Sequence, residues 1–409
     1  MNSSNSKILK MLAGTSIAQA MPLLVAPFLT RLYTPEQFGD FGFLVLAVTI
    51  LSITATLRYE MAITLPRYSK VAANVVYVVI TLSFCFSILL LLSLASLQLF
   101  SSNFFDLNQF GWQILFIPVC VFLMSIFQSL YYWFNRDGMY NINATSRVLT
   151  SGSIALVQLI CGLLAKFKMI GLMLGHTTGY GISSLFLLTY AINSLRRHHG
   201  ISLRRYVFIL KRYVDFPKYL VISSTLNILS RQSPVIFLTI FHSAMEAGYY
   251  ILLQRTFAAP ISVIGVAVAD VFREEASRSY RANKNCYYEL ITTIKKLLMV
   301  SALPFILVGI YSPFLFSFIF GDDWQTAGEY ARYLAPMFFL QFIASPVSSI
   351  YIITGKQRED LFLQVIALAG VSIIFSSISE IELLLVVFST FYCLIYLLVI
   401  VRSIKMSKE

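Results

Sequence analysis

The chain has 409 residues, of which 58 % are apolar and only 12 % charged, and its net charge is +12. Soluble domains carry about 25 % charged and about 45–50 % apolar residues, so this composition excludes an ordinary soluble enzyme, a disordered protein and a coiled coil. It indicates an all-α polytopic membrane protein. An excess of Lys and Arg is also typical of nucleic-acid binding, and the positions of these residues decide between the two interpretations.

Twelve stretches of the sequence are long and apolar enough to be membrane helices, which need about 20 mainly apolar residues. The predicted spans are 11–30, 41–64, 73–100, 111–134, 145–165, 169–192, 219–241, 248–271, 292–318, 330–353, 361–379 and 381–401. The first span follows Lys7 and Lys10 in the manner of a signal peptide. Its apolar run continues to Leu29, so we interpret it as a retained membrane helix.

The basic residues predict the orientation of these spans. An even number of spans puts both termini on one side of the membrane. With both termini in the cytoplasm, 25 Lys and Arg fall on the cytoplasmic side, and the outer side receives Arg31, Lys166, Lys168 and Arg332. This asymmetry follows the positive-inside rule. It predicts a multi-pass protein with cytoplasmic termini, and it accounts for the basic charge without a nucleic-acid partner.

The chain contains an internal repeat. Phe38-Gly39-Asp40 opens the second span, and Ala247-Gly248-Tyr249 opens the eighth span about 209 residues later. We therefore predict six-helix lobes at 1–195 and 218–409, joined by a basic cytoplasmic connection at 196–217. Parallel repeats of this kind occur in transporters, where they enclose a central cavity and alternate between two openings.

Two arginines, Arg231 and Arg255, lie inside predicted spans, where a charge at the helix centre costs at least ~2.5 kcal/mol. Arg231 shares a polar helix face with Asn227, and Gln254 precedes Arg255. No Asp or Glu lies clearly at mid-membrane to neutralise them. One interpretation is that they bind an anion in the cavity, and a diphosphate suits them because arginine bonds phosphate oxygens in pairs. The alternative is that they only lock neighbouring helices together.

Other features are local. Arg58 and Glu60, near the inner end of the second span, are predicted to pair or to reach the interface, and a gating or coupling role is the alternative. Small residues at Gly171, Gly175 and Gly179 predict close helix packing.

The sequence has no catalytic constellation, so we expect no enzymatic activity, no cofactor and no metal. A membrane enzyme of glycan assembly is disfavoured because no large outer loop is present.

Two motifs resemble those of a known transporter family. Leu32-Tyr33-Thr34-Pro35-Glu36-Gln37-Phe38-Gly39 and Leu57-Arg58-Tyr59-Glu60-Met61-Ala62-Ile63-Thr64-Leu65-Pro66 resemble bacterial oligosaccharide flippases of the polysaccharide transporter family, which includes the Wzx-type O-antigen flippases. The resemblance implies two six-helix lobes, as in multidrug/oligosaccharidyl-lipid/polysaccharide exporters. It also implies an undecaprenyl-diphosphate-linked oligosaccharide as substrate and location in the bacterial inner membrane. A polysaccharide polymerase and a chain-length regulator are the implied partners.

The related lipid II flippase suggests roles for individual residues. Its eighth span has a functionally important arginine five residues before a proline, and Arg255 stands five residues before Pro260. Arg31 and Asp40 match an arginine and an aspartate that flank the outer end of its first span. The resemblance implies that Arg31 contacts substrate and that Asp40 takes part in gating or coupling.

One departure from that pattern leaves room for other interpretations. Val25 stands where the lipid II flippase has a further arginine, so the phosphate site has to differ, and Arg231 is the candidate replacement.

The second functional hypothesis is a multidrug-type small-molecule or ion antiporter of the same fold. Spans 1 and 7 contain no acidic residue for a cation, which argues against it. The coupling ion is left open between H⁺ and Na⁺.

Overall fold

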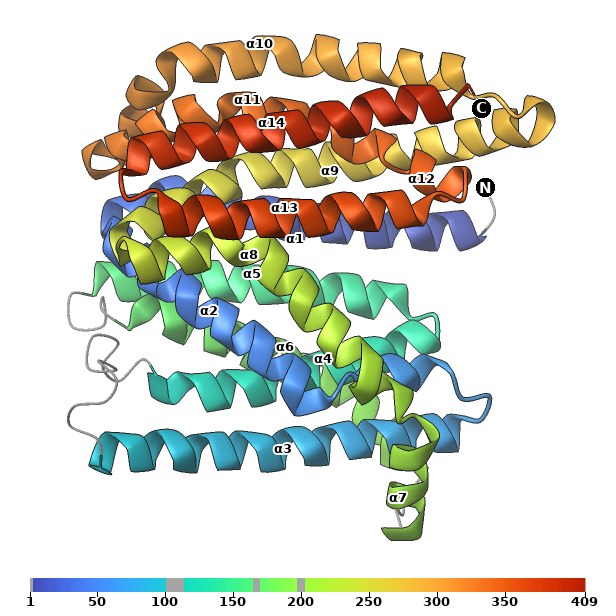
Figure 1. Cartoon of the computed structure of the whole chain (residues 1–409). Coiled ribbons are helices and arrows are strands. Elements are labelled where there is room, and N and C mark those ends of the chain that lie inside the picture. Colours follow the sequence, from blue (N-terminus) through green and yellow to red (C-terminus); the bar gives the residue numbers. More distant parts are fainter. Residues whose placement is uncertain (1–2, 101–113, 165–169, 197–202, 409) are drawn as a thin grey trace. The chain divides into compact units, whose positions relative to one another are not determined.

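A computed structural model describes residues 3–100, 114–164, 170–196 and 203–408, and these residues form helices and short connections without a β-strand. Twelve of the helices have 21 residues or more, and they correspond one for one to the twelve predicted spans (Figure 1). Seven are long and apolar enough to cross a membrane, and two more helices contain shorter apolar stretches. The all-α class predicted from the sequence is therefore confirmed. Lys166 and Lys168 lie outside the described residues.

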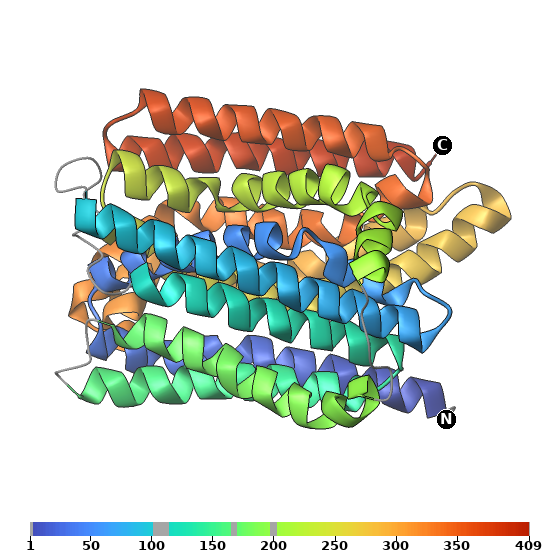
Figure 2. The same cartoon turned by 90° about the horizontal axis from the view of Figure 1, so that it is seen from below.

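The helices form two compact units, the first of which comprises Met1–Tyr33 and Asp40–Gln232. Its α5 packs against α1 and α6, and its α4 packs against α3 and α6 (Figure 2). The elements of this unit are α1 (Ser3–Leu32), α2 (Pro35–Thr56, beyond its first turn), η1 (Tyr59–Thr64), α3 (Ser69–Phe100), α4 (Phe116–Arg136), α5 (Tyr140–Leu163), α6 (Gly171–Arg196), α7 (Leu203–Arg212), η4 (Phe216–Leu220) and the first part of α8 (Val221–Phe241).

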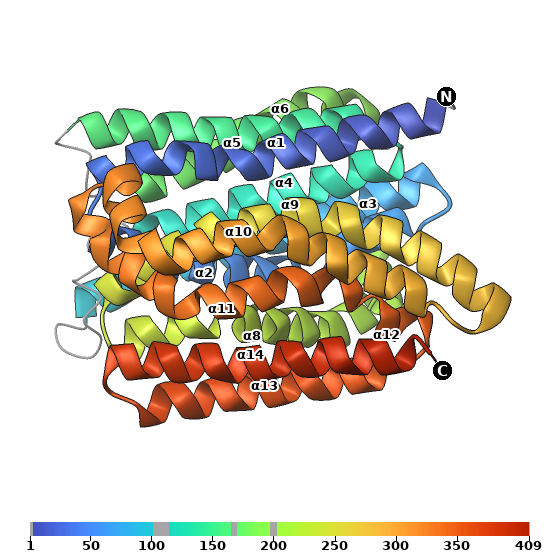
Figure 3. The same ribbon diagram turned by 90° about the horizontal axis from the view of Figure 1, so that it is seen from above.

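The second unit comprises Thr34–Gly39 and Ser233–Glu409. Its central helix is α11, which packs against α9, α10 and α14 (Figure 3). After the end of α8, its elements are α9 (Ala244–Asn283), α10 (Tyr287–Phe320), η5 (Asp322–Trp324), α11 (Gln325–Val347), α12 (Ile350–Ile353), α13 (Gln357–Ser377) and α14 (Ile381–Met406). The six-helix lobes at 1–195 and 218–409, with their connection at 196–217, remain a prediction.

Several predicted helix boundaries differ from the structure, and two of these differences have a clear physical reason. The second span was expected to continue to residue 64, but α2 ends at Thr56 because Leu57 and Arg58 have φ angles of 49° and 61°. This left-handed conformation cannot continue a right-handed helix. The eighth span was expected to end at 271, but α9 continues to Asn283. The extension buries Phe272 and Ala276 in a hydrophobic cluster. On its exposed side Glu274 and Arg278 form a pair at 2.9 Å, a spacing that supports a helix beyond its apolar part.

The glycine series of α6 packs as the sequence predicts. A Cβ atom added to Gly175 would overlap the side chain of Gln158, and one added to Gly179 would overlap Ile154, both on α5. The close approach lets Gln158 Nε2 donate a hydrogen bond to the carbonyl oxygen of Leu172 at 2.9 Å. Small residues thus allow α5 and α6 to satisfy a buried amide between them.

The two glycines of the internal repeat meet each other inside the second unit. A Cβ atom on Gly39 would overlap the carbonyl oxygen of Ala244, and a Cβ atom on Gly248 would overlap that of Pro35. Both pairs of equivalent residues, Pro35 with Ala244 and Gly39 with Gly248, are 209 positions apart. The first turns of α2 and α9 therefore cross symmetrically, with backbone against backbone, and only glycine fits at the two contact positions.

We predict that Gly248→Ala destabilises the protein by about 1–3 kcal/mol, because the added methyl group meets a backbone carbonyl that cannot rotate away. The measurement is the unfolding temperature in detergent. Gly309→Ala on α10 is the matched control, since a Cβ atom there meets nothing within 4 Å. An equal response of the two variants would contradict the crossing.

Candidate functional site

Arg255 rests on a buried aromatic cluster in the second unit. Its guanidinium carbon lies 5.4 Å from the ring centroid of Phe38, which comes from the first turn of α2. Phe38 is fully buried and meets Trp324 edge to face at 5.1 Å, and Trp324 contacts Tyr249 at 6.0 Å. An aromatic face attracts a cation by about 0.5–2 kcal/mol, depending on how far both are desolvated. The aromatic cluster therefore supports a positive charge within the predicted span 248–271.

Glu246, in the first turn of α9, takes part in two hydrogen bonds. Glu246 accepts a hydrogen bond from the hydroxyl of Tyr330, and its backbone N–H donates to the N-cap Ser243 at 3.2 Å. Tyr330 in turn packs edge to face on Tyr249 at 5.7 Å. Glu246 thus connects the beginning of α9 to Tyr330, which packs against the aromatic cluster.

Gln254, predicted to bind substrate, is half-buried on α9. Its side chain lies near that of Tyr250, one turn earlier on the same helix. Tyr250 is buried and packs against Phe388 of α14 at 6.4 Å. A substrate role for Gln254 remains a prediction.

The polar face of α8 carries Asn227 and Arg231, one turn apart and both exposed. These two residues belong to the first unit, whereas Arg255 belongs to the second. Joint binding of one diphosphate by the two arginines remains a prediction. A guanidinium has five N–H donors in a planar fork, so each arginine by itself has the chemistry to bind a phosphate group.

Arg31 and Asp40 flank the connection between α1 and α2. Arg31 is exposed in the last turn of α1, and Asp40 is half-buried directly after Gly39. Both lie in the first unit. Their binding and gating roles stay predictions.

Arg58 and Glu60 form a buried ion pair where α2 breaks. Arg58 Nη1 lies 3.2 Å from Glu60 Oε1, and the Glu60 side chain is fully buried. Arg58 Nε also donates to Ser224 Oγ on α8 at 3.0 Å. The expected pairing is therefore present, while its gating or coupling role remains a prediction. The sequence did not identify Ser224 as a partner, although it belongs to the polar face of α8.

The geometry of this pair depends on backbone strain. A left-handed conformation costs a non-glycine residue roughly 1–2 kcal/mol, and it occurs here at two consecutive residues. The backbone N–H of Arg58 donates to Thr56 Oγ1 at 3.3 Å, which supports the turn. The second carboxylate oxygen of Glu60 is buried without a hydrogen bond among the described residues.

Tyr59 connects the same turn to α7. Its hydroxyl donates to the carbonyl oxygen of Leu210 at 3.0 Å. Burial raises the pKa of Tyr59, with a smaller contribution from nearby Tyr206. The phenol therefore keeps its proton and acts as a hydrogen-bond donor.

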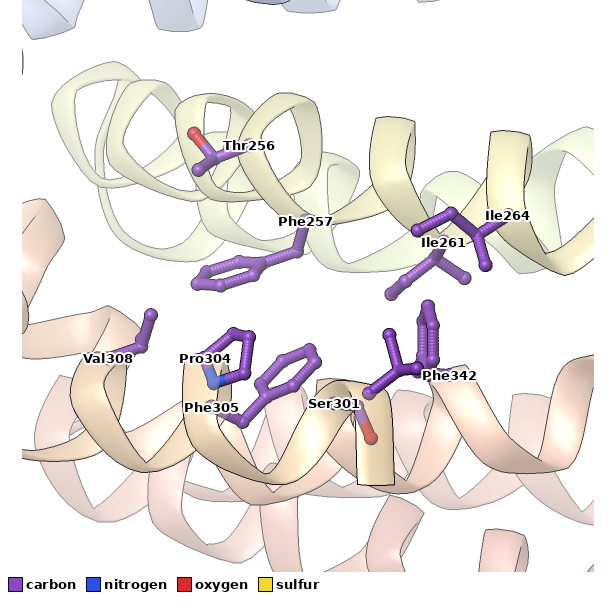
Figure 4. A pocket seen from close by; sticks show the side chains of 10 residues that line it. Thr256, Phe257, Ile261, Ile264, Ser301, Pro304, Phe305, Val308 and Phe342 are labelled. Carbon is purple, nitrogen blue, oxygen red and sulfur yellow. The ribbon is translucent and has the colours of Figure 1, made fainter. Parts of the chain in front are cut away.

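An apolar pocket of about 240 Å³ lies between α9, α10 and α11 (Figure 4). Its lining includes Phe257 and Ile264, which lie on the side of α9 opposite Arg255 at 100° per residue. The two hydroxyl groups in its lining donate hydrogen bonds to backbone carbonyl oxygens of their own helices. Thr256 donates to Leu252 at 2.9 Å, and Ser301 donates to Leu297 at 2.7 Å. The pocket therefore has the chemistry for an apolar chain and not for a sugar.

Comparison with known proteins identifies a family. A family model described as "Polysaccharide biosynthesis protein" matches residues 28–329, which is most of the chain. No curated protein matches.

Solved structures show the fold. A multidrug resistance MATE family transporter of the MOP superfamily, in an inward-facing conformation, aligns with a TM-score of 0.68 and 14 % identity over 97 % of this chain and 98 % of its own. A MOP superfamily transporter from Pyrococcus furiosus aligns with a TM-score of 0.60 and 14 % identity over 98 % and 94 %. The chain therefore has the fold of a multi-pass MOP-type membrane transporter.

The ion pair generates a stability prediction. Arg58→Met leaves the Glu60 carboxylate buried without its partner, and such a loss typically costs about 3–5 kcal/mol. We expect a lower unfolding temperature in detergent. The double variant Arg58→Met with Glu60→Met should regain most of the lost stability, because no buried charge remains.

Arg278→Met is the control for this prediction. Arg278 pairs with Glu274, but both side chains are 74 % exposed, and exposed pairs contribute little. An Arg58→Met protein as stable as the Arg278→Met protein would show that the buried pair is unimportant for stability.

Proposed function

The chain belongs to the polysaccharide biosynthesis protein family, and from this premise we propose that it is a flippase for undecaprenyl-diphosphate-linked oligosaccharide repeat units. It moves them across the bacterial inner membrane for O-antigen or other surface polysaccharide synthesis. Such a substrate has an anionic diphosphate, a polar glycan and a long apolar tail. A transporter for it has to hold an anion at membrane depth.

The observation that carries this proposal is the placement of Arg255. An arginine inside a membrane helix marks a functional site, because the cost of its burial is otherwise avoided. The aromatic face of Phe38 supports the guanidinium, which has the donor geometry to bind a diphosphate. In the proposed cavity, Arg255 and Arg231 bind the diphosphate, while Asn227, Gln254 and Arg31 contact the remaining polar groups of the substrate.

The proposed cycle is alternating access. The chain passes between its two units within α2, after Gly39, and within α8, after Gln232. These helices carry the residues to which we assign gating or coupling: Asp40 on α2, and Arg58 with Glu60 directly after α2, bonded to α8 through Ser224. A polysaccharide polymerase and a chain-length regulator are the proposed partner proteins.

A multidrug-type antiporter is the second candidate, because the similar solved structures include multidrug transporters. Likeness at 14 % identity supports the fold and does not transfer a substrate. A cation-coupled drug carrier needs acidic groups in its cavity, and the sequences of α1 and α8 contain none. The family match and the arginines favour the flippase.

The decisive experiment is a strain lacking the gene and any second flippase. We expect undecaprenyl-diphosphate-linked repeat units to accumulate in its lipid extract while surface polysaccharide is lost. The intact gene reverses both changes. Arg255→Ala should reduce export about 10- to 100-fold, because hydrogen bonds to charged groups contribute roughly 1.5–3 kcal/mol.

Arg332→Ala is the matched control, since Arg332 is exposed and donates to the carbonyl oxygen of Ile310. It should complement fully at equal membrane abundance, measured by immunoblot. Export that survives Arg255→Ala unchanged at native expression would refute the anion site. Normal glycan without lipid accumulation in the deletion strain would refute the flippase and favour drug efflux.

The proposed orientation gives a separate prediction. With both termini in the cytoplasm, a green fluorescent protein fused after Glu409 should fluoresce, and alkaline phosphatase fused at the same position should be inactive. The reverse pattern would place the C-terminus outside and invert the topology.

A further inference from the structure

Helix α7 differs in direction from α3, a long helix of the same unit. In Figure 1 it runs across the direction of α3, near the end at which α3 begins, and it extends beyond α3. It ends at Arg212, and α8, which corresponds to the predicted span 219–241, begins at Val221. Because eight residues separate the two helices, α7 lies close to the level at which the chain enters the membrane.

One face of α7 is anchored in the first unit. Ile209 and Tyr213 are buried in its hydrophobic core, and Tyr206 and Leu210 pack against the same core. These positions follow the spacing i, i+3, i+4 and i+7 of a single helix face. The remaining side chains of α7 are therefore turned away from the core.

The opposite face combines cations with exposed apolar groups. Arg204, Lys211 and Arg212 are exposed, and so are Val207 and Phe208, which are 42 % and 56 % accessible. The guanidinium of Arg212 lies 5.8 Å from the ring centroid of Phe208. Basic residues around an exposed aromatic ring are typical of helices that lie in the interface of an anionic membrane.

We propose that α7 is a binding surface for anionic phospholipids. Arg204, Lys211 and Arg212 bind the lipid phosphate groups, and Phe208 and Val207 enter the boundary between headgroups and acyl chains. A lipid surface fits better than an acidic protein because the helix lies across α3 close to the start of α8, and because its outer face carries apolar groups among the charges. The proposal requires α7 at a membrane surface but does not require the transport of any substrate.

Bound lipid would act on the turn that holds the buried ion pair. The carbonyl oxygen of Leu210 on α7 accepts the hydrogen bond of Tyr59, and Tyr59 stands between Arg58 and Glu60. Lipid that immobilises α7 therefore stabilises the segment that contacts Ser224 on α8.

The test uses the full chain in nanodiscs of phosphatidylcholine, with or without phosphatidylglycerol. A polarity-sensitive fluorophore on Val207→Cys, in a Cys85→Ser background, reports entry of α7 into the lipid. We expect a blue shift that depends on phosphatidylglycerol. Each basic side chain near an anionic surface strengthens attraction about fivefold, so Arg204→Gln with Lys211→Gln and Arg212→Gln should raise the required anionic lipid at least about tenfold.

The control removes the same charge elsewhere. Arg273→Gln with Lys295→Gln and Lys296→Gln alters three exposed basic residues of the second unit and should leave the blue shift intact. A shift independent of phosphatidylglycerol, or lost equally in both triple variants, would overturn the proposal. A response to soluble polyglutamate in place of phosphatidylglycerol would also overturn it and identify an acidic protein partner.

A second variant tests the connection to the ion pair. We expect phosphatidylglycerol to raise the unfolding temperature of the wild-type chain. Tyr59→Phe should keep the blue shift of the α7 label and lose most of this stabilisation, because it removes only the hydrogen bond to Leu210. Equal stabilisation of both proteins would show that the hydrogen bond does not transmit the effect.

Discussion

The contact on which the rest of the second unit depends is the crossing of α2 and α9 at Gly39 and Gly248. Each glycine lies against the carbonyl oxygen of the residue that begins the opposite helix. Membrane helices gain little from hydrophobic association with each other, so close backbone packing of small residues supplies much of their attraction. The crossing brings the first turn of α2 into the second unit. It thereby places Phe38 between Trp324 and Arg255.

The other end of α2 is fixed by a different interaction. Two consecutive left-handed residues end the helix, and the chain then buries Glu60 beside Arg58. A buried ion pair contributes little net stability, because desolvation offsets the attraction between the charges. What it supplies is a defined geometry, since Arg58 also holds Ser224 on α8. One helix thus positions a candidate anion site at its start and a candidate gate at its end.

Polar and apolar chemistry are separated on the two sides of α9. Arg255 presents a cation on one side of α9, whereas the pocket on its opposite side is apolar and has its hydroxyls satisfied. The proposed diphosphate contact therefore belongs to the Arg255 side of α9 and not to the pocket. The amphipathic α7 adds a cationic surface to the first unit.

The sequence by itself determined the all-α class, the twelve long helices and the repeated glycines, because hydropathy, helix length and local motifs are properties of neighbouring residues. It also singled out Arg255 and Arg231 as costly charges within spans. Tertiary structure alone decided that α2 stops at Thr56 and that Phe38 supports Arg255. It also decided that Arg58 reaches Ser224, 166 positions away. These features depend on where the folded backbone brings distant residues together, and the periodicity of a single helix carries no information about its partner.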